Sequence, residues 1–230
     1  KIKKLKNEIN IGVVGKYIDL KDAYKSLHEA LYHASFQNNS KLNITYIDSE
    51  DLEKKSPKDL LSGCDGILVP GGFGNRGFEG KISAIKYARE KNIPFFGICL
   101  GLQMAVVEFA RNVCNLKNAN SRESGRKIKD FVIDIMENQK SLDTKGGNMR
   151  LGDYPCEIKK STKVSDAYKK NKIFERHRHR YEVNPKYHSI LTKNGLVLSG
   201  LSPDGKLAET IEIKEHPWFV ACQFHPEFKS

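Results

Sequence analysis

The chain has 230 residues, of which 39% are hydrophobic and 29% charged, and its mean hydropathy is −0.54. This composition suits one folded globular domain and is too apolar for a disordered tail. Lysine and arginine number 39 against 28 aspartate and glutamate, which gives a net charge of +11. The lysines are spread along the chain, which favours a solvated lysine-rich surface over a nucleic-acid interface.

Membrane and secreted proteins are also disfavoured. No apolar run approaches the ~18 residues that a membrane span requires, and residues 1–6 (KIKKLK) lack the apolar core of a secretory signal. The five cysteines are an odd number and include no C-x-x-C pair. This usage predicts neither a disulfide framework nor a cysteine metal site, so we expect a cytoplasmic protein with free thiols.

The first part of the chain alternates between short apolar strands and amphipathic helices. The predicted strands are 9–15, 42–47, 66–70 and 94–98. The predicted helices are 22–34, with Asp22 as its N-cap, 79–91, with Ile82, Ile85 and Tyr87 or Ala88 facing inward, and 102–111. Because helices separate successive strands, the pattern predicts parallel βαβ units with helices on both faces of a sheet.

The rhythm changes after residue 118. Residues 118–150 are polar with little pattern, and we expect an irregular excursion there. From residue 196 onward the segments 196–198, 208–213 and 218–224 predict strands. With no internal repeat, we expect a single domain over 1–230. The expected fold class is α/β, an open and mostly parallel sheet flanked by helices, with an added antiparallel β portion.

A cysteine lies between two glycines where a predicted strand meets a predicted helix. The string GICLG at 97–101 fits the G-x-nucleophile-x-G elbow of hydrolases, with Cys99 in place of serine. The turn would present Cys99 at the carboxyl edge of the sheet, where open α/β folds place their active sites. It also lies at a helix N-terminus, which favours the thiolate. A buried, inert cysteine is the alternative that the motif alone leaves open.

Two further segments can complete an acyl-transfer site around Cys99. The backbone N–H groups of Leu100 and of Gly72, in the turn GGFG, are candidate donors to an oxyanion, although such turns are also common without function. The motif HPE follows the last predicted strand. Residues two apart in an extended chain point to the same side, so Glu227 can orient the imidazole of His225. Each segment alone also fits a role without function, an ordinary tight turn or a solvated surface pair. Together they favour nucleophilic amide chemistry.

These strings resemble a known family. PGGFGNRG at 70–77, GICLGLQ at 97–103 and FHPEF at 224–228 are similar to the motifs of the class I, triad-type glutamine amidotransferases. The longer strings ERHRHRYEVN at 175–184 and HPWFVACQ at 216–223 resemble the glutaminase domains of the CTP synthase branch of this family. The resemblance covers nearly the whole chain, and it implies a flavodoxin-like fold.

The resemblance implies a mechanism. Cys99 would attack the side-chain amide of L-glutamine, His225 would protonate the leaving ammonia and then activate water, and Glu227 would hold His225. Gly72 and Leu100 would form the oxyanion hole. The residues that the resemblance places against glutamine are Gly72, Leu100, Gly101, Leu102, Gln103, Glu123 and Arg180.

Charge agrees with two of these assignments. Free glutamine carries an α-amino group, which Glu123 can pair with, and an α-carboxylate, which suits the planar fork of Arg180. This reading gives the Arg-His string at 176–181 a role other than binding nucleic acid or metal. We therefore expect no metal site at His177 and His179.

The resemblance also implies partners outside this chain. The family's amidoligase domain, which binds ATP, UTP and Mg²⁺, is expected to be absent from 1–230, so we expect no cofactor in this domain. Ammonia would pass through a channel to that domain and aminate UTP to CTP. GTP would activate the glutaminase, with Arg76 and its loop in that control, and the full-length family is expected to form a homotetramer. We expect neither a nucleic-acid nor a membrane partner.

Two other functions stay open. A γ-glutamyl hydrolase or peptidase could use the same scaffold, although Glu123 and Arg180 argue for a free amino-acid headgroup. A catalytically silent regulatory or nucleic-acid-binding module could also keep this fold, although the intact triad residues argue against it. Residues 124–148 match the family pattern poorly, so no contact is assigned to them.

Overall fold

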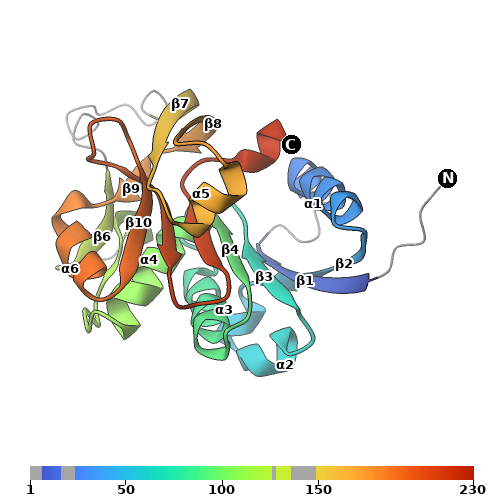
Figure 1. The fold of residues 1–230 in the computed structure, drawn as a ribbon. Helices are drawn as coiled ribbons and strands as arrows, with labels where there is room; N and C mark the ends of the chain where they lie inside the picture. The colour runs from blue at the N-terminus through green and yellow to red at the C-terminus, as the bar shows by residue number, and fades with distance from the viewer. Residues whose placement is uncertain (1–6, 17–23, 126–127, 136–148) are drawn as a thin grey trace.

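A nine-stranded sheet runs through the centre of the computed structural model (Figure 1). Its strand order is β2-β1-β3-β4-β12-β11-β10-β7-β8. The structure describes residues 7–16, 24–125, 128–135 and 149–230. The predicted helix cap Asp22 lies outside the described residues, as does the segment 136–148.

One half of this sheet is parallel. Its strands are β1 (Asn7–Gly15), β2 (Ser40–Asp48), β3 (Gly66–Val69), β4 (Phe95–Ile98) and β12 (Phe219–Cys222). Each neighbouring pair in the order β2-β1-β3-β4-β12 runs parallel. The four strands predicted in the first hundred residues are confirmed, and their carboxyl ends share one sheet edge.

Helices cover both faces of the parallel half, as predicted. In Figure 1, α1 lies on one side of the sheet, and α2, α3 and α4 lie on the other. These helices are α1 (Lys25–Gln37), α2 (Pro57–Leu61), α3 (Phe78–Lys91) and α4 (Leu100–Asn112). Ile82, Ile85 and Ala88 of α3 are buried, as their spacing predicts. The helix α4 begins two residues before the predicted start at 102, because its first turn follows Cys99 directly.

The other half of the sheet is antiparallel and begins earlier in the chain than predicted. Its strands are β7 (Arg150–Ile158), β8 (Lys172–His179), β10 (Leu196–Leu201) and β11 (Ala208–Ile213), and the helices α5 (Lys163–Tyr168) and α6 (His188–Lys193) lie between them in sequence. The prediction that β structure begins at 196 is wrong. Strand β8 alternates perfectly between exposed and buried residues, but its buried side includes Glu175, His177 and His179. Hydropathy does not reveal such a strand.

A second, three-stranded sheet takes two of its strands from the segment 118–150, which the sequence predicts to be irregular. It has the order β5-β6-β9, with β5 (Asn120–Ser121), β6 (Phe131–Ile135) and β9 (Tyr181–Val183). The prediction for 118–150 is therefore wrong over these described residues. The signal is weak because β5 is two residues long and β6 buries two consecutive residues, Val132 and Ile133, instead of alternating.

Apolar cores lie on the two faces of the large sheet. Val13 and Val14 are consecutive and fully buried, and they belong to different core clusters, since successive strand residues point to opposite faces. Val14 packs in the cluster that contains α3 and α4, whereas Val13 packs in the cluster that contains α1 and α5. Within the described ranges, every helix is too short or too polar to traverse a lipid bilayer.

Candidate active site

Cys99 lies at the turn between β4 and α4 with a backbone conformation that few residues adopt. Its φ is 51° and its ψ is −99°, and the residue is 3% exposed. A Cβ at Gly101 would lie 2.1 Å from the backbone oxygen of Val69, and one at Gly97 would lie 2.8 Å from the carbonyl carbon of Gly101. Both glycines are needed because α4 packs directly on the strand ends, and the strained backbone conformation of the elbow falls on Cys99 itself.

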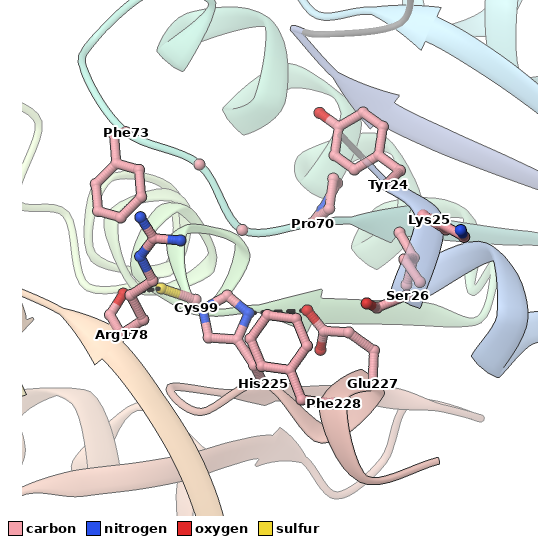
Figure 2. Close-up of a pocket in the computed structure, with 13 residues that line it drawn as sticks. Tyr24, Lys25, Ser26, Pro70, Phe73, Cys99, Arg178, His225, Glu227 and Phe228 are labelled. Carbon is pink, nitrogen blue, oxygen red and sulfur yellow. Dashed lines mark hydrogen bonds and ion pairs between the residues drawn. The ribbon is translucent and has the colours of Figure 1, made fainter. Parts of the chain in front are cut away.

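The imidazole of His225 reaches the same sheet edge from the far end of the sequence. Strand β12 pairs in parallel with β4, with Cys222 opposite Ile98, so both strands end side by side. His225 Nδ1 lies 2.8 Å from Glu227 Oε1 (Figure 2). The expected pair forms, but not through strand alternation, because Glu227 lies in a short 3-10 helix, Pro226–Lys229.

The surroundings of His225 favour its protonated form. Burial lowers the pKa of His225, but hydrogen bonds with Cys99 and Glu227, together with the negative charges of these two groups, outweigh burial and raise the pKa to about 10. A protonated imidazole donates from both ring nitrogens. Nδ1–H can therefore donate to Glu227 while Nε2–H points its charge at the Cys99 sulfur, which is the arrangement of an activated thiol nucleophile.

The glycine-rich turn that follows β3 packs against both His225 and Cys99. A Cβ at Gly71 would lie 2.7 Å from His225 Cε1 and 3.6 Å from Cys99 Cβ. No side chain fits at Gly71 unless the imidazole moves. Gly72 follows, and Leu100 is the first residue of α4, so its N–H is one of those that a helix leaves unpaired within itself.

A cavity of about 260 Å³ opens beside these groups (Figure 2). Its walls come from the start of α1, the turn after β3, the elbow, strand β8 and the 3-10 helix near the end of the chain. It is lined by Tyr24, Lys25, Ser26, Leu27, Pro70, Gly71, Gly72, Phe73, Cys99, Arg178, His225, Glu227 and Phe228. The proposed nucleophile, base and carboxylate thus share one small-molecule cavity, although they are up to 128 positions apart in the sequence.

Of the seven residues expected to contact glutamine, one lines this cavity. Gly72 lines it. Leu100 and Gly101 are buried at the start of α4, and Leu102 and Gln103 are buried further along the same turn. The first N–H groups of α4 have no partner within the helix and are suited to donate to an anionic ligand.

Glu123 and Arg180 are brought to the same neighbourhood by the small sheet. Glu123 accepts a hydrogen bond of 2.6 Å from the Gly74 N–H, and burial raises the pKa of its carboxyl group. Burial and the charge of Glu123 raise the pKa of the Tyr181 phenol, and the Arg180 charge opposes them, so both charges act at this ring. Among the described residues, the buried Nε of Arg180 has no hydrogen-bond partner. Such a donor is suited to an anionic ligand.

The loop after Gly72 is held by polar contacts along its length. Lys16 Nζ donates to the backbone oxygen of Phe73, and Arg76 Nη2 donates to the Lys16 oxygen at 2.9 Å. Asn75 Nδ2 donates to the Ser124 oxygen at 3.2 Å. Arg76, which the resemblance links to control by GTP, is thus part of the scaffold of this loop.

Arg178 is a cavity residue that the sequence did not single out. Its guanidinium carbon lies 5.6 Å from the centre of the Phe73 ring, and its backbone oxygen lies 3.9 Å from Cys99 Sγ (Figure 2). The signal was present in the alternation of β8, which places Arg176 and Arg178 on the exposed face. Tyr24 and Ser26 also line the cavity, and no local pattern marks them, because only the packing of α1 brings them there.

His177 and His179 face the interior, where each is 2% exposed. His177 Nδ1 lies 2.8 Å from His179 Nε2. Burial and the Arg150 charge lower the pKa of His177 to about 2 and that of His179 to about 3, so both rings are neutral. Arg150 is paired instead with Glu209, at 2.7 Å between Nη1 and Oε1. In the part of the chain that the structure describes, no group of three or more His, Cys, Asp and Glu side chains could hold a metal ion.

Comparison with known proteins agrees with this geometry. Residues 19–230 match the family model for class-I glutamine amidotransferases, and the chain belongs to this family. Its relatives narrow the class further: it is similar to CTP synthases. It is 56% identical over 229 residues to the CTP synthase of Clostridium acetobutylicum, and 56% identical over 230 residues to that of Methanocaldococcus jannaschii.

The match covers 100% of this chain but 43% of the Clostridium protein, so the chain spans less than half of that relative. A solved structure of the glutaminase domain of Trypanosoma brucei CTPS with bound acivicin has 42% identity and a TM-score of 0.89, over 96% of this chain and 86% of that one. The fold class and the family resemblance are confirmed.

Proposed function

We propose that this protein hydrolyses L-glutamine to glutamate and ammonia through a glutamyl thioester on Cys99. The observation that carries the proposal is the pairing of a strained elbow cysteine with a His225 whose pKa is raised to about 10 and which is held by Glu227. Glutamine is supported as the substrate by the family match and by the solved relative, which is a glutaminase domain.

The geometry supports a two-step reaction. In the first step the Cys99 thiolate forms a bond to the amide carbon, and the N–H groups of Gly72 and Leu100 stabilise the oxyanion. The C–N bond then breaks as His225 protonates the nitrogen, and ammonia leaves. In the second step the neutral His225 takes a proton from water, the hydroxide attacks the thioester, and glutamate departs. The thiolate and the imidazolium are restored, with Glu227 stabilising the charge on His225.

The proposed recognition of glutamine uses charges at the rim of the site. The carboxylate of Glu123 would bind the α-amino group, and the unpaired Nε–H of Arg180 would bind the α-carboxylate. Backbone atoms of Gly101 and Leu102, and the amide of Gln103, complete the set that the family resemblance suggests. Glu123 would have to share its oxygens between glutamine and the Gly74 N–H.

For the longer protein we extend the proposal to CTP synthesis. The relatives at 56% identity are CTP synthases of more than twice this length. On this basis, 1–230 is a glutamine amidotransferase domain whose ammonia passes to an amidoligase domain that uses ATP, UTP and Mg²⁺. GTP is the proposed effector and the homotetramer the proposed assembly. A cytoplasmic location is supported by the free thiols of all five cysteines.

Ammonia release tests the proposal. The protein is incubated with L-glutamine, with and without GTP, and ammonia and glutamate are measured together with a Cys99→Ala variant. We expect equal amounts of both products from the unaltered protein and none from the variant. Ammonia release that persists in the Cys99→Ala variant would contradict the proposal.

The same assay decides between the alternatives. A γ-glutamyl hydrolase would turn over γ-glutamyl peptides in preference to free glutamine, whereas Glu123 and Arg180 predict the reverse order. A silent module would release no ammonia under any condition, including in the full-length protein with GTP. Salt-dependent binding of RNA without ammonia release would point to a nucleic-acid module instead.

A further inference from the structure

A buried chain of two glutamine side chains ends at the sulfur of Cys99. Gln223 Nε2 lies 3.7 Å from Cys99 Sγ. Gln103 Nε2 lies 3.3 Å from Gln223 Oε1 and 2.9 Å from the backbone oxygen of Tyr181. Gln223 is 0% exposed and Gln103 is 3% exposed, so bulk water does not compete for these groups. The backbone of Gln223 is fixed in turn, because its N–H donates to the Glu209 oxygen at 2.8 Å.

The carbonyl of Tyr181 sets the direction of this chain. A carbonyl oxygen can only accept, so the Gln103 atom that faces it must be the NH₂ group. The same NH₂ group faces Gln223, which must therefore present its side-chain oxygen. The NH₂ group of Gln223 is left to face the sulfur of Cys99. The orientation of both amides thus follows from the network, and the group that meets the nucleophile is a donor.

We propose that Gln223 is a further catalytic residue, which donates a hydrogen bond to the Cys99 sulfur and stabilises its thiolate, and that Gln103 is the positioning residue that orients the Gln223 amide. Hydrogen bonds to a charged acceptor are stronger than those to a neutral one, so the donor favours thiolate over thiol. The inference rests on the proposed function only in taking Cys99 as the nucleophile.

Gln223 and His225 serve the sulfur in different ways. His225 gives up its proton to the leaving ammonia, whereas an amide keeps its protons at every step. Gln223 therefore holds the sulfur in the attacking position before the first step and again when the thioester breaks. The backbone oxygen of Arg178, at 3.9 Å, is an acceptor for the proton of the neutral thiol. The hydrogen bond from Gln223 stabilises the thiolate relative to the neutral thiol.

Alkylation of Cys99 as a function of pH tests this inference. The rate of modification by iodoacetamide is followed at Cys99 by mass spectrometry for the unaltered protein and for Gln223→Glu and Gln223→Met. Gln223→Glu keeps an oxygen facing Gln103, removes the donor at the sulfur and adds a negative charge that repels the thiolate. Near neutral pH we expect Gln223→Met to react about tenfold more slowly, because a hydrogen bond to a charged group is lost, and Gln223→Glu to lose at least as much. At high pH, where the thiol ionises without help, the rates should converge.

Matched variants separate this effect from general damage. Cys222→Ala removes the buried side chain next to Gln223, at the end of β12, and should keep the unaltered pH profile, whereas Gln103→Met should shift it by less than the Gln223 variants. If Gln223→Met does not fold, Gln223→Glu carries the test. Variants of Gln223 that react with the unaltered pH profile would overturn the inference, and so would a loss that is equal at all pH values. A shifted profile in a protein that releases no ammonia would sustain the hydrogen bond from Gln223 to the thiolate, and it would refute the proposed function and with it the catalytic role of Gln223.

Discussion

Cys99 and His225, the proposed nucleophile and base, are held in place by different forces. Cys99 is fixed by shape: an atom added at Gly101 would lie 2.1 Å from the Val69 oxygen. His225 is fixed by polar contacts, since its backbone N–H donates to the Arg176 oxygen at 2.8 Å and its ring pairs with Glu227. An atom added at Gly101 would therefore clash with the backbone. The contacts of His225, in contrast, can be removed one at a time by substitution. Substitutions on the two sides should fail in different ways.

The largest effect is expected on the steric side, at Gly101. Gly101→Ala places a methyl group against backbone atoms that cannot move aside, so we expect a loss of more than about 4 kcal/mol of stability or no folded protein at all. Gly63→Ala is the matched control, because nothing lies within 4 Å of a Cβ at that position. Urea unfolding measures both. A Gly101→Ala protein as stable as the control would mean that shape does not fix the elbow.

On the polar side, Glu227→Gln should leave the fold intact and impair the chemistry. The amide keeps the shape but loses the charge that supports protonated His225, so we expect glutamine hydrolysis to fall about 10²–10⁴-fold. Lys229→Ala, in the same 3-10 helix, is the control and should keep the rate. Equal rates for Glu227→Gln and the unaltered protein would show that the pair does not act in catalysis.

The charge on His225 also predicts the pH at which its ring loses a proton, with and without Glu227. A pKa of about 10 means that the ring stays protonated at neutral pH and loses its proton only as the pH rises toward 10. In Glu227→Gln the same loss should occur at lower pH, because a negative neighbour is gone. Titration of the His225 ring resonances by NMR follows both proteins. A ring that is neutral at pH 7 in the unaltered protein would contradict the assignment.

Gly71 lies against both His225 and Cys99. We expect its substitution to have a smaller effect than those of Gly101 and Glu227. A Cβ there would lie 2.7 Å from His225 Cε1, which is a side-chain atom that can swing away. We expect Gly71→Ala to fold and to lose about 10²-fold in glutamine hydrolysis, because a displacement of about 1 Å in a catalytic group costs that much. Thermal unfolding and ammonia release are measured together. Full activity would show that a Cβ at Gly71 does not displace the His225 ring from its catalytic position.

The smallest effect is expected behind the glycine-rich loop, at the buried Lys81. Its Nζ donates to Ser49 Oγ at 3.0 Å and to the Gly77 oxygen at 3.3 Å. Burial, reinforced by the charge of Lys16, lowers the pKa of Lys81 from 10.5 to about 8. Between these values the unfolded chain binds a proton that the folded protein does not, so stability rises with pH across this window.

Replacing Lys81 removes that rise. Relative to Lys81→Met, the unaltered protein should gain about 2 kcal/mol of stability between pH 7 and pH 10, as measured by urea unfolding. Glutamine hydrolysis should change less than tenfold, since Lys81 lies behind the loop and not in the cavity. Parallel pH profiles for the two proteins would show that Lys81 carries no buried charge.

The sequence predicted the features that depend on neighbouring residues. The strands before residue 100 are short apolar runs, and the elbow around Cys99 and the pair of His225 and Glu227 are local motifs. It failed where long-range packing decides the structure. Strand β8 was missed because its buried positions carry Glu175 and His177, polar side chains that a hydropathy pattern assigns to the exposed face.

The same distinction explains the site. Cys99 and His225 could be named from motifs, whereas Arg178 enters the cavity only because β8 runs past the elbow. The contact between Gln223 and Cys99 joins residues that are 124 positions apart, and no spacing rule anticipates it. Strand alternation does not explain the contact between His225 and Glu227 for a similar reason. Glu227 lies in a 3-10 turn, and that turn depends on how the end of the chain packs.

A reactive glutamine analogue tests the central claim, that a sulfur from the elbow and an imidazole from the end of the chain form one reacting pair. The protein and a His225→Ala variant are treated with the analogue, and the modified residue is mapped by mass spectrometry. We expect a single label on Cys99 in the unaltered protein and almost none in the variant. A label on another residue, or an equally fast label on Cys99 without His225, would contradict the account.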